Sequence, residues 1–586
     1  MEGCCRRTAG SSAPSQLLAA LAQGNDAVWV QHLLPKLKAH NSLGSVALSC
    51  KQLRALCLSN ANALRLSSSN TQQQHELLQQ LPARFPACST VQYTAVDGPA
   101  IGHFADLLPA LVRLPQLSQL KLKLTTQAAS AAIPAAYAVD TARLQLSGVT
   151  SLSLTAHRAW AEADGAGYAW RALGRFTQLQ ALTVAFTTQS PEFQATQLSA
   201  LSTLSGNLRS LRITCPGFKA EEQQQDYNAL SSLSSLTQLV LPYAAGATGV
   251  PAISSCSSLL RLSLSGPAGR RSAGPTLGVA ECAALELLTQ LTYLRLTSIP
   301  CNQTLLSALQ RLQQLQVLQV DGLKAADALP ALARLPQLKS IAGEWQESAG
   351  AAAAAGTTLQ LTAVRYLEVA GTCAPFQTFP GVKTVLLFNT CQPGDLTALS
   401  QHCKQLQLLG MGHTWRMEAS TLAPAAPVAQ RTAAVASLAA LRHLRSLFLS
   451  VNCDAEISAL AAASQLRQLT LFVPTTDRTT RGCSTIGLAA LGLLRSLRQL
   501  TLQLPGLVLT AEPVCGLMSS MQRFESVEVC VVPGQEEGVD AGLELALERH
   551  IRVPAAFKVA SNKNWPRFIH RRSINPGLGG GILVGN

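Results

Sequence analysis

Cysteine and histidine are the side chains of this sequence that could bind a metal or act as a nucleophile or base. The sixteen cysteines are scattered singly except for Cys4 and Cys5, and no CxxC pair occurs to begin a zinc or redox site. The ten histidines and few acidic residues provide little material for acid–base chemistry, and no HExxH, GxSxG or phosphate-loop motif is present. We therefore expect a protein that is not an enzyme and that has no catalytic residues, no cofactor and no metal site.

The composition predicts a soluble protein of a reducing compartment. Apolar residues are 47% of the chain, but polar residues interrupt nearly every apolar stretch, and no run reaches the roughly 20 residues that a membrane-spanning helix needs. Residues 1–16 contain an arginine pair with no apolar run directly after it, which does not fit a secretion signal. We expect a cytoplasmic or nuclear location, with most cysteines present as buried free thiols.

A repeated LxxLxL unit must position any functional surface, because it organises most of the chain. Copies begin at Leu117, Val149, Leu179, Leu208, Leu236, Leu259, Leu291, Leu315, Val364, Val382, Leu406, Leu444, Leu466 and Leu497, and weaker copies begin at Ala61, Cys88, Leu338 and Phe524. The mean interval is about 27 residues, which indicates a repeat protein. Apolar residues at the fourth and sixth positions alternate as in a strand that buries one face.

Leucines spaced by three precede several copies and predict a short helix before each strand. Leu438 and Leu441 lead into the copy at Leu444, and Leu491 and Leu494 lead into the copy at Leu497. One unit cannot bury its leucines alone, so parallel units must stack into a continuous core. Because helices are wider than strands, we expect an α/β solenoid curved as a horseshoe, with parallel strands on the concave side and short helices on the convex side. A concave sheet of this kind would be on the order of 80 Å long and would bind a macromolecule.

The motif resembles the leucine-rich-repeat superfamily over about 480 residues. The resemblance implies a protein-interaction scaffold and does not identify the partner. The superfamily often has Asn or Cys three residues beyond the last strand leucine, and in this chain only Asn452 lies at that position. We place the array of about 18 repeats at residues 61–548, after a disordered stretch at 1–13 and a helical segment at 14–60, and before a basic, disordered tail at 549–586.

Residues 14–60 lack the strand motif and are predicted to be helical. Residues 43–56 are similar to the second half of an F-box, whereas Leu34 and Pro35 are followed by lysines where an F-box has an acidic residue. The resemblance implies docking to the Skp-type adaptor of a cullin ubiquitin ligase, with the array selecting the substrate. Alternatively, the segment caps the core of the first repeat. The candidate docking residues are Leu34, Pro35, Val46, Leu48, Leu53 and Leu56.

The third, fifth and seventh positions of each unit should point away from the core and line the concave face. Earlier repeats have cations there, which suit an acidic partner, and later repeats have apolar and aromatic residues, which are typical of an interface core. The candidates are Lys121, Lys123, Arg212, Arg261 and Arg295 in the basic set, and Tyr366, Leu386, Phe388, Leu408, Phe448 and Phe472 in the apolar set. Two alternatives stay open: inserted loops could cover these side chains, or the register could differ by one residue.

Three functions are compatible with the sequence. The first is a substrate-recognition adaptor of a cullin-type ubiquitin ligase, which we favour, and the second is a structural protein of a cytoskeletal or axonemal assembly. The third is a nucleic-acid-associated protein, because residues 549–586 carry half of the net charge of +14 and no acidic residue. We expect a protein partner and no membrane insertion. We do not favour nucleic-acid binding, because a solvated tail is the preferred interpretation of residues 549–586.

Overall fold

The computed structural model describes residues 63–67, 80–94, 111, 114–123, 148–156, 173, 176–186, 195–215, 227–243, 250–266, 276–346, 359–371, 375–388, 391–411, 426–472, 485–503, 526–531 and 557–561. The chain divides into two compact units, Met1–Arg271 and Ser272–Asn586. The division falls in a stretch rich in Pro and Gly, PAGRRSAGP at 267–275, where neither helix nor strand is favoured. The array expected over 61–548 is thus shared between two units.

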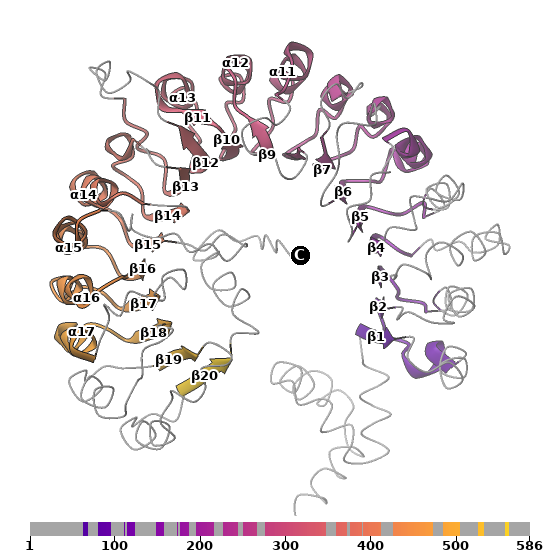
Figure 1. Cartoon of the computed structure of the whole chain (residues 1–586). Coiled ribbons are helices and arrows are strands. Elements are labelled where there is room, and N and C mark those ends of the chain that lie inside the picture. The colour runs from indigo at the N-terminus through magenta and orange to yellow at the C-terminus, as the bar shows by residue number, and fades with distance from the viewer. Residues whose placement is uncertain are drawn as a thin grey trace, which may run out of the picture. The chain divides into compact units, whose positions relative to one another are not determined.

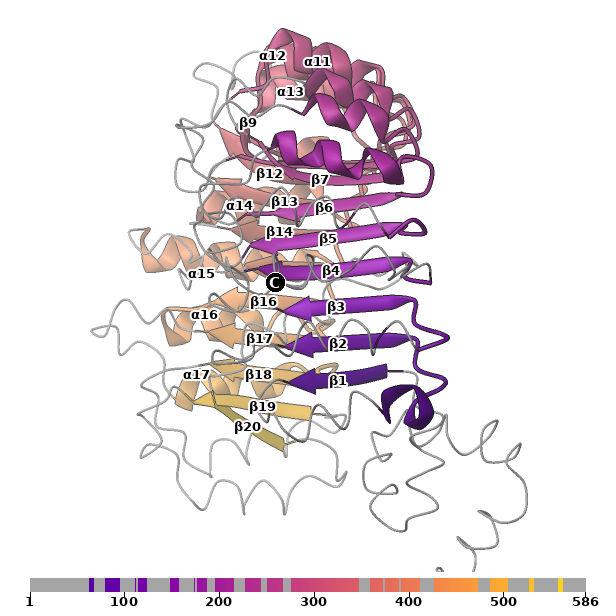
Figure 2. The ribbon, with the colours of Figure 1, turned by 90° about the vertical axis from the view of Figure 1, so that its right-hand side faces the viewer.

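Parallel strands, each beginning at the third residue of one copy of the motif, form one side of the first unit (Figure 1). They are β1 (Ala63–Ser67), β2 (Thr90–Thr94), β3 (Gln119–Lys123), β4 (Ser151–Ala156), β5 (Ala181–Phe186), β6 (Ser210–Thr214), β7 (Gln238–Pro242) and β8 (Arg261–Ser265). Each strand pairs in parallel with the next, and Figure 2 shows them stacked in order. The 3-10 helices η3 (Ala195–Leu204), η4 (Asn228–Ser232) and η5 (Val250–Ser255) precede β6, β7 and β8.

The second unit repeats this arrangement, with α-helices in most repeats (Figure 1). Its strands are β9 (Tyr293–Pro300), β10 (Val317–Asp321), β11 (Leu323–Lys324), β12 (Ser340–Gln346), β13 (Tyr366–Gly371), β14 (Thr384–Phe388), β15 (Leu408–Met411), β16 (Ser446–Ser450), β17 (Gln468–Phe472), β18 (Gln499–Gln503), β19 (Ser526–Val531) and β20 (Phe557–Ser561). Its helices are α11 (Val279–Glu286), α12 (Gln303–Leu309), α13 (Ala325–Leu332), α14 (Pro393–His402), α15 (Val428–Ser437), α16 (Asp454–Leu460) and α17 (Thr485–Ala490), with 3-10 helices η7 (Phe376–Thr378), η8 (Leu438–Ala440) and η9 (Leu491–Leu493). All of its strand pairs are parallel.

The motif leucines form the core of each unit, as the alternation predicted. Leu211, Leu239 and Leu262 are register partners on β6, β7 and β8, and none of them is exposed to solvent. The residues on either side of Leu211, Ser210 and Arg212, are half-buried. Every one of the motif copies is followed, two residues after its start, by the first residue of a strand. These strands therefore have the predicted register, and the alternative of a one-residue shift is wrong for them.

Leucines spaced by three are joined by successive backbone hydrogen bonds before β16. The N–H of Leu441 donates to the carbonyl of Leu438, and the N–H of Leu444 donates to the carbonyl of Leu441, both at 3.0 Å. Bonds that join residues three apart define a 3-10 turn, in which side chains spaced by three share one face. The helix that leads into β16 accordingly changes from the α-helix α15 to the 3-10 helix η8.

In the short repeat between Val364 and Val382, aromatic side chains occupy the place that an α-helix has in most repeats of this unit. The described residues of this repeat between β13 and β14 form the 3-10 helix η7 and no α-helix. Phe376 in η7 is buried, and Phe379 directly after η7 is fully buried. The ring of Trp345 on β12 meets that of Phe379 edge to face, with centroids 6.0 Å apart. The three large rings fill volume that a longer repeat would fill with an α-helix.

One strand lies inside the segment that we expected to be a disordered tail. Within 549–586, residues Phe557–Ser561 form β20, which pairs in parallel with β19 and aligns Phe557 with Val527. This strand lies beyond residue 548, where we expected the array to end. The copy was not recognised because its positions read PAAFKV, in which Pro, Phe and Val stand where the motif has leucine. A search for leucine alone misses such a unit, although its apolar alternation is preserved.

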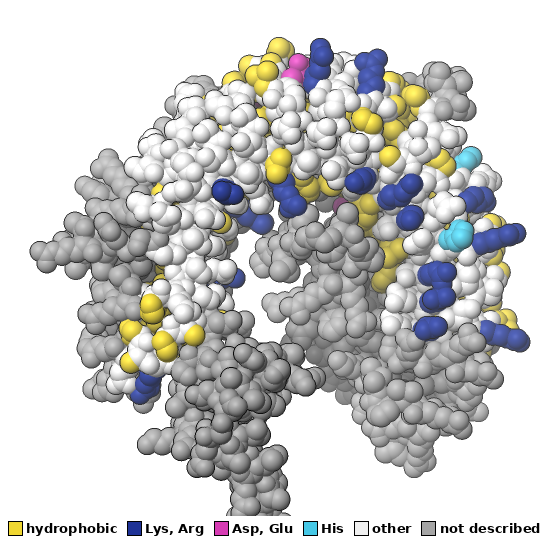
Figure 3. All heavy atoms as spheres, turned by 180° about the vertical axis from the view of Figure 1, so that it is seen from behind, with side chains coloured by type: hydrophobic (Ala, Val, Ile, Leu, Met, Phe, Trp, Pro, Cys, Tyr) yellow, Lys and Arg dark blue, Asp and Glu magenta, His cyan; other side chains and the backbone are white. Residues whose placement is uncertain are grey.

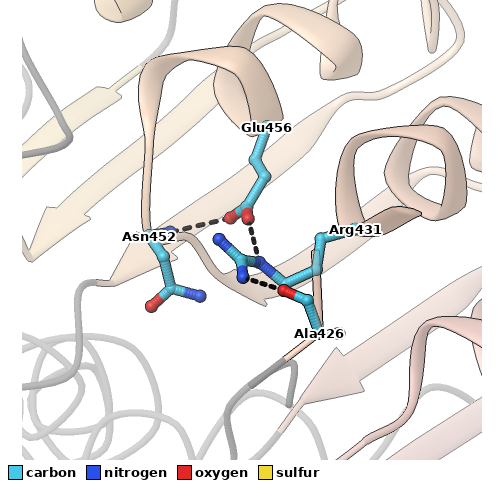
Figure 4. A network of polar contacts seen from close by, with 4 residues as sticks. All are labelled: Ala426, Arg431, Asn452 and Glu456. Carbon is cyan, nitrogen blue, oxygen red and sulfur yellow. Dashed lines mark hydrogen bonds and ion pairs between the residues drawn. The ribbon is translucent and has the colours of Figure 1, made fainter. Parts of the chain in front are cut away.

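A buried ion pair connects the helices before and after β16 (Figure 4). The Nε of Arg431 on α15 donates to the Glu456 carboxylate on α16 at 2.6 Å, and the side chains are 7% and 0% exposed. The other carboxylate oxygen of Glu456 accepts the backbone N–H of Asn452 at 2.7 Å, and Arg431 also donates to the Ala426 carbonyl. Glu456 thus accepts a backbone N–H of the turn after β16. The resemblance implied that the side chain of Asn452 would bind the backbone in this turn. The Asn452 Nδ2 is buried and has no hydrogen-bond partner among the described residues.

Candidate functional site

Apolar side chains gather on the outward positions of β14, β15 and β16. We call Leu386, Phe388, Leu408 and Phe448 the apolar patch. All four side chains are half-buried. The register aligns Leu386 on β14 with Gly410 on β15 and Phe448 on β16, so these positions lie one strand spacing, about 4.8 Å, apart. The structure thus brings together four of the six apolar candidates that the sequence predicted.

Gly410, which the sequence analysis did not single out, shapes the centre of the patch. A Cβ atom at this position would lie 2.6 Å from Cδ2 of Leu386 and 4.0 Å from Cδ2 of Phe448. The side chains of the two neighbouring strands therefore lean over the glycine from either side. The signal was present in the sequence, because Gly410 is the fifth residue of the copy that begins at Leu406, and reading the fifth positions of adjacent copies in order would have found it.

Tyr366 lies beside the patch and is fixed by a neighbour on its own strand. Its hydroxyl donates to Oε2 of Glu368 at 3.0 Å. Burial, together with the negative charge of Glu368, raises the pKa of Tyr366 above its usual range, so the phenol stays protonated and remains a donor. Tyr366 and Thr384 are register partners, and Thr384 in turn aligns with Leu408. The pair gives the patch a polar border that includes one carboxylate.

Phe472 is buried, although we predicted that its ring would be exposed on the concave face. It stands at the seventh position of its copy, on the face predicted to be outward, yet only 6% of its surface is exposed. Its register partner Ser450 is fully buried as well. The seventh position is the last of the strand, where the chain leaves toward the next helix. The alternation along a strand determines to which face a side chain points. It does not determine whether other parts of the chain cover that side chain.

The basic candidates are spread over separate strands. In the first unit, Lys121 on β3 and Arg261 on β8 are exposed, and Arg212 on β6 is half-buried. Lys123 ends β3, and its side chain lies outside the described residues. Arg295 belongs to the second unit, on β9, where its Nε donates to Oγ1 of Thr297 at 3.1 Å. In register, Ser153 and Thr183 separate Lys121 from Arg212. Arg261 lies in a different row, where it aligns with Gln238, so the described cations do not form a continuous stripe.

The F-box-like docking candidates fall outside the described residues. This applies to Leu34, Pro35, Val46, Leu48, Leu53 and Leu56, since the described part of the chain begins at β1. Adaptor docking and helical capping both remain predictions for this segment.

The described cysteines are free, and they are buried or half-buried as predicted. Cys256 and Cys403 stand three residues before the motif copies that follow them, where other repeats have leucine. Burial raises the pKa of Cys256 to about 11 and that of Cys403 to about 12, so both remain neutral thiols at physiological pH. Within the described ranges, no three His, Cys, Asp or Glu side chains lie close enough together to hold a metal ion. No helix in those ranges has the length and apolar character that crossing a bilayer requires.

The parallel strands, inward leucines and short helices of both units make the fold that of a leucine-rich-repeat solenoid. No family model matches the chain, and no curated protein matches its sequence. The structure is similar to that of an internalin from Listeria monocytogenes, at 16% identity and a TM-score of 0.36, over 62% of this chain and 94% of the internalin. It is also similar to a leucine-rich-repeat protein from Leptospira interrogans, at 13% identity and a TM-score of 0.34, over 80% of this chain and 93% of that protein.

Proposed function

We propose that this leucine-rich-repeat solenoid is a non-enzymatic scaffold that binds another protein through the apolar patch of its second unit. The observation that carries the proposal is the alignment of Leu386, Gly410 and Phe448 on three neighbouring strands, with Leu408 beside them. Apolar side chains on a regular sheet gain free energy when a partner removes their remaining surface from water, at roughly 25 cal/mol per Å². The strands already hold these side chains in place, so binding costs little additional ordering.

The surroundings of the patch suit a protein interface. Thr384 and Ser446, both half-buried, flank Leu408 on either side in register. The Tyr366 and Glu368 pair lies one strand further along. Protein interfaces combine an apolar centre with a polar rim of this kind, and aromatic residues are enriched at the centre.

Replacing Leu386 and Phe448 together by alanine should abolish capture of the partner while leaving the fold intact. Both side chains are half-buried at the surface, and loss of two central contacts typically weakens binding by about tenfold or more. The measurement is quantitative mass spectrometry of proteins captured by, and labelled in proximity to, the full chain in cells. Thermal melting of the same variants reports on the fold.

The matched control replaces Leu287 and Leu493, which are 66% and 64% exposed and lie outside the patch, by alanine. A partner that is lost from the patch variant and retained by the control supports the proposal. Equal retention by both variants would refute it.

We propose further that the partner is a substrate of a cullin-type ubiquitin ligase and that residues 14–60 dock the Skp-type adaptor. Support comes from the F-box-like pattern at residues 43–56 and from the order of the parts, since the first copy of the motif begins at Ala61. An adaptor segment in front of a repeat array would bring the ligase and the selected protein onto one chain.

Alanine at both Leu53 and Leu56 should remove co-purification of the Skp-type adaptor and leave capture through the apolar patch unchanged. The two leucines belong to the apolar side of the F-box-like pattern, and their loss would remove contacts that the adaptor buries. Immunoblotting for the adaptor after affinity purification measures this. If the wild-type chain does not co-purify with the adaptor, or if the variant co-purifies as well as wild type, the segment acts as a cap and not as a docking site.

A further inference from the structure

A column of cations runs along the edge at which strands β12 to β18 of the second unit begin. It occupies the second position of the motif, which is the residue directly before each strand. We call the column the basic ladder, and it consists of Lys339, Arg365, Lys383, Arg445, Arg467 and Arg498, with Gln407 between Lys383 and Arg445. Arg498 is half-buried, and the other five cations are exposed.

Backbone hydrogen bonds hold the ladder in register. The carbonyl of Lys383 accepts the N–H groups of Gln407 and Leu408 at 2.8 and 3.0 Å, and the carbonyl of Gln407 accepts the N–H of Arg445 at 2.8 Å. The same bond at 2.8 Å joins Arg467 to Arg445. Successive ladder residues therefore lie about one strand spacing apart, 4.8 Å, and the six steps from Lys339 to Arg498 span roughly 29 Å.

The fold does not require cations at this position. The first unit has the same backbone bonds, but the residues there are Ser118, Thr150, Gln180, Arg209, Thr237 and Leu260. Uncharged side chains can occupy this position, and some of them form hydrogen bonds along the column. The hydroxyl of Thr150 donates to the carbonyl of Ser118 at 3.2 Å, and the hydroxyl of Thr237 donates to the carbonyl of Arg209 at 3.0 Å. Like charges on neighbouring strands repel one another and weaken the pairing. The ladder therefore costs stability that a neutral column would not.

The middle of the ladder is not neutralised within the described part of the chain. No described acidic side chain forms an ion pair with Lys383, Arg445 or Arg467. The turns before the same strands add Arg442 and Arg495, which are also exposed. In Figure 3, Lys and Arg side chains in dark blue gather along the right of the view, where hardly any magenta Asp or Glu side chain is seen. Arg365 differs from the three central cations, because it donates to two backbone carbonyls of the adjacent turns.

We infer that the basic ladder is a second interaction surface, which binds an acidic α-helix of a partner protein. Carboxylates three or four residues apart on a helix recur about every 5.4 Å, one helical turn, and this interval is close to the spacing of the ladder. A helix that lies along the column can thus pair successive carboxylates with successive cations. Each new ion pair also relieves the repulsion within the ladder.

Charge pattern and side-chain type favour an acidic helix over nucleic acid. Binding of single-stranded nucleic acid relies on exposed aromatic side chains that stack on bases. Among the described residues, the ladder and the turns before it expose no Phe, Tyr or Trp, because Phe379 is fully buried. The basic ladder and the apolar patch share no residue. The ladder occupies the second position of the motif, and the patch occupies the third, fifth and seventh positions. Substitutions in one surface therefore leave the residues of the other unchanged, and binding to each can be measured separately.

The test measures fluorescence anisotropy of a labelled alanine-rich helical peptide, with glutamate at every fourth residue, on the full chain. A peptide with glutamine at the same positions is the control ligand. The variant R445Q/R467Q neutralises the centre of the ladder. The variant R84Q/R311Q removes the same charge from two exposed arginines outside it, and L386A/F448A removes only the apolar patch.

The wild-type chain should bind the glutamate peptide in a salt-sensitive manner and the glutamine peptide much more weakly. R445Q/R467Q should lose about tenfold or more in affinity, whereas R84Q/R311Q and L386A/F448A should change it by less than about twofold. Because repulsion is relieved, R445Q/R467Q should melt at the wild-type temperature or above. The inference is overturned by any of three results: both arginine variants lose affinity equally, R445Q/R467Q unfolds, or a short DNA duplex binds the ladder more tightly than the glutamate peptide at the same ionic strength.

Discussion

Leu447→Asp should prevent the second unit from folding into a soluble form. Leu447 is completely buried on β16, and its register partners Leu409 and Leu469 are at most 1% exposed. An aspartate there must either carry an unpaired charge into the core or take up a proton, and both cost several kcal/mol. The defect also spreads to the neighbouring coils, because each repeat of a solenoid buries its leucines only against the repeats beside it. The measurement is the soluble fraction on expression, followed by circular dichroism of any soluble protein.

Leu493→Asp provides the control for this substitution. Leu493 belongs to the same unit and is 64% exposed, so aspartate at that position can remain hydrated, and the effect should stay within about 0.5 kcal/mol. Soluble, cooperatively melting Leu447→Asp protein would show that this position does not face the core.

Glu456→Ala should destabilise the second unit by about 3–5 kcal/mol, because it removes one partner of a buried ion pair. Arg431 is 6% exposed and Glu456 is fully buried. The carboxylate also accepts the N–H of the half-buried Asn452 at 2.7 Å, so the substitution removes a second hydrogen bond as well. Hydrogen exchange should accelerate first in α15 and α16. Urea unfolding measured together with exchange mass spectrometry separates this local loss from global unfolding.

The double variant R431M/E456L tests whether the cost comes from breaking the buried ion pair. Replacing a buried ion pair by apolar residues of similar volume is often neutral or stabilising, because the desolvation penalty disappears together with the pair. We expect R431M/E456L to be more stable than Glu456→Ala and close to wild type. If Glu456→Ala exchanged and unfolded as the wild type does, the pair would contribute nothing to stability.

The apolar patch and the basic ladder give one unit two surfaces of different chemistry. The patch consists of half-buried side chains along strands β14 to β16, whereas the ladder consists of charges at the strand starts from β12 to β18. Apolar burial is insensitive to salt, and the pairing of exposed charges is screened by it. Partner capture at low and high ionic strength should therefore separate the contributions of the two surfaces.

The sequence by itself determined the local parts of this structure. It located the strands and the residues that face inward, since burial of alternate leucines depends only on positions within one LxxLxL unit. Leu211 and Leu447 follow that rule. The free, buried cysteines also follow from residue type and local position.

The tertiary structure determined the contacts that each repeat makes with its neighbouring repeats. The intervals between copies range from Val364–Val382 to Leu406–Leu444, so the repeat alone could not show that Arg431 meets Glu456 or that Phe379 packs on Trp345. The low exposure of Phe472 and the pairing of β20 with β19 likewise depend on neighbours. Single motif positions acquire a shared property, as in the basic ladder, only when backbone hydrogen bonds between coils place them side by side.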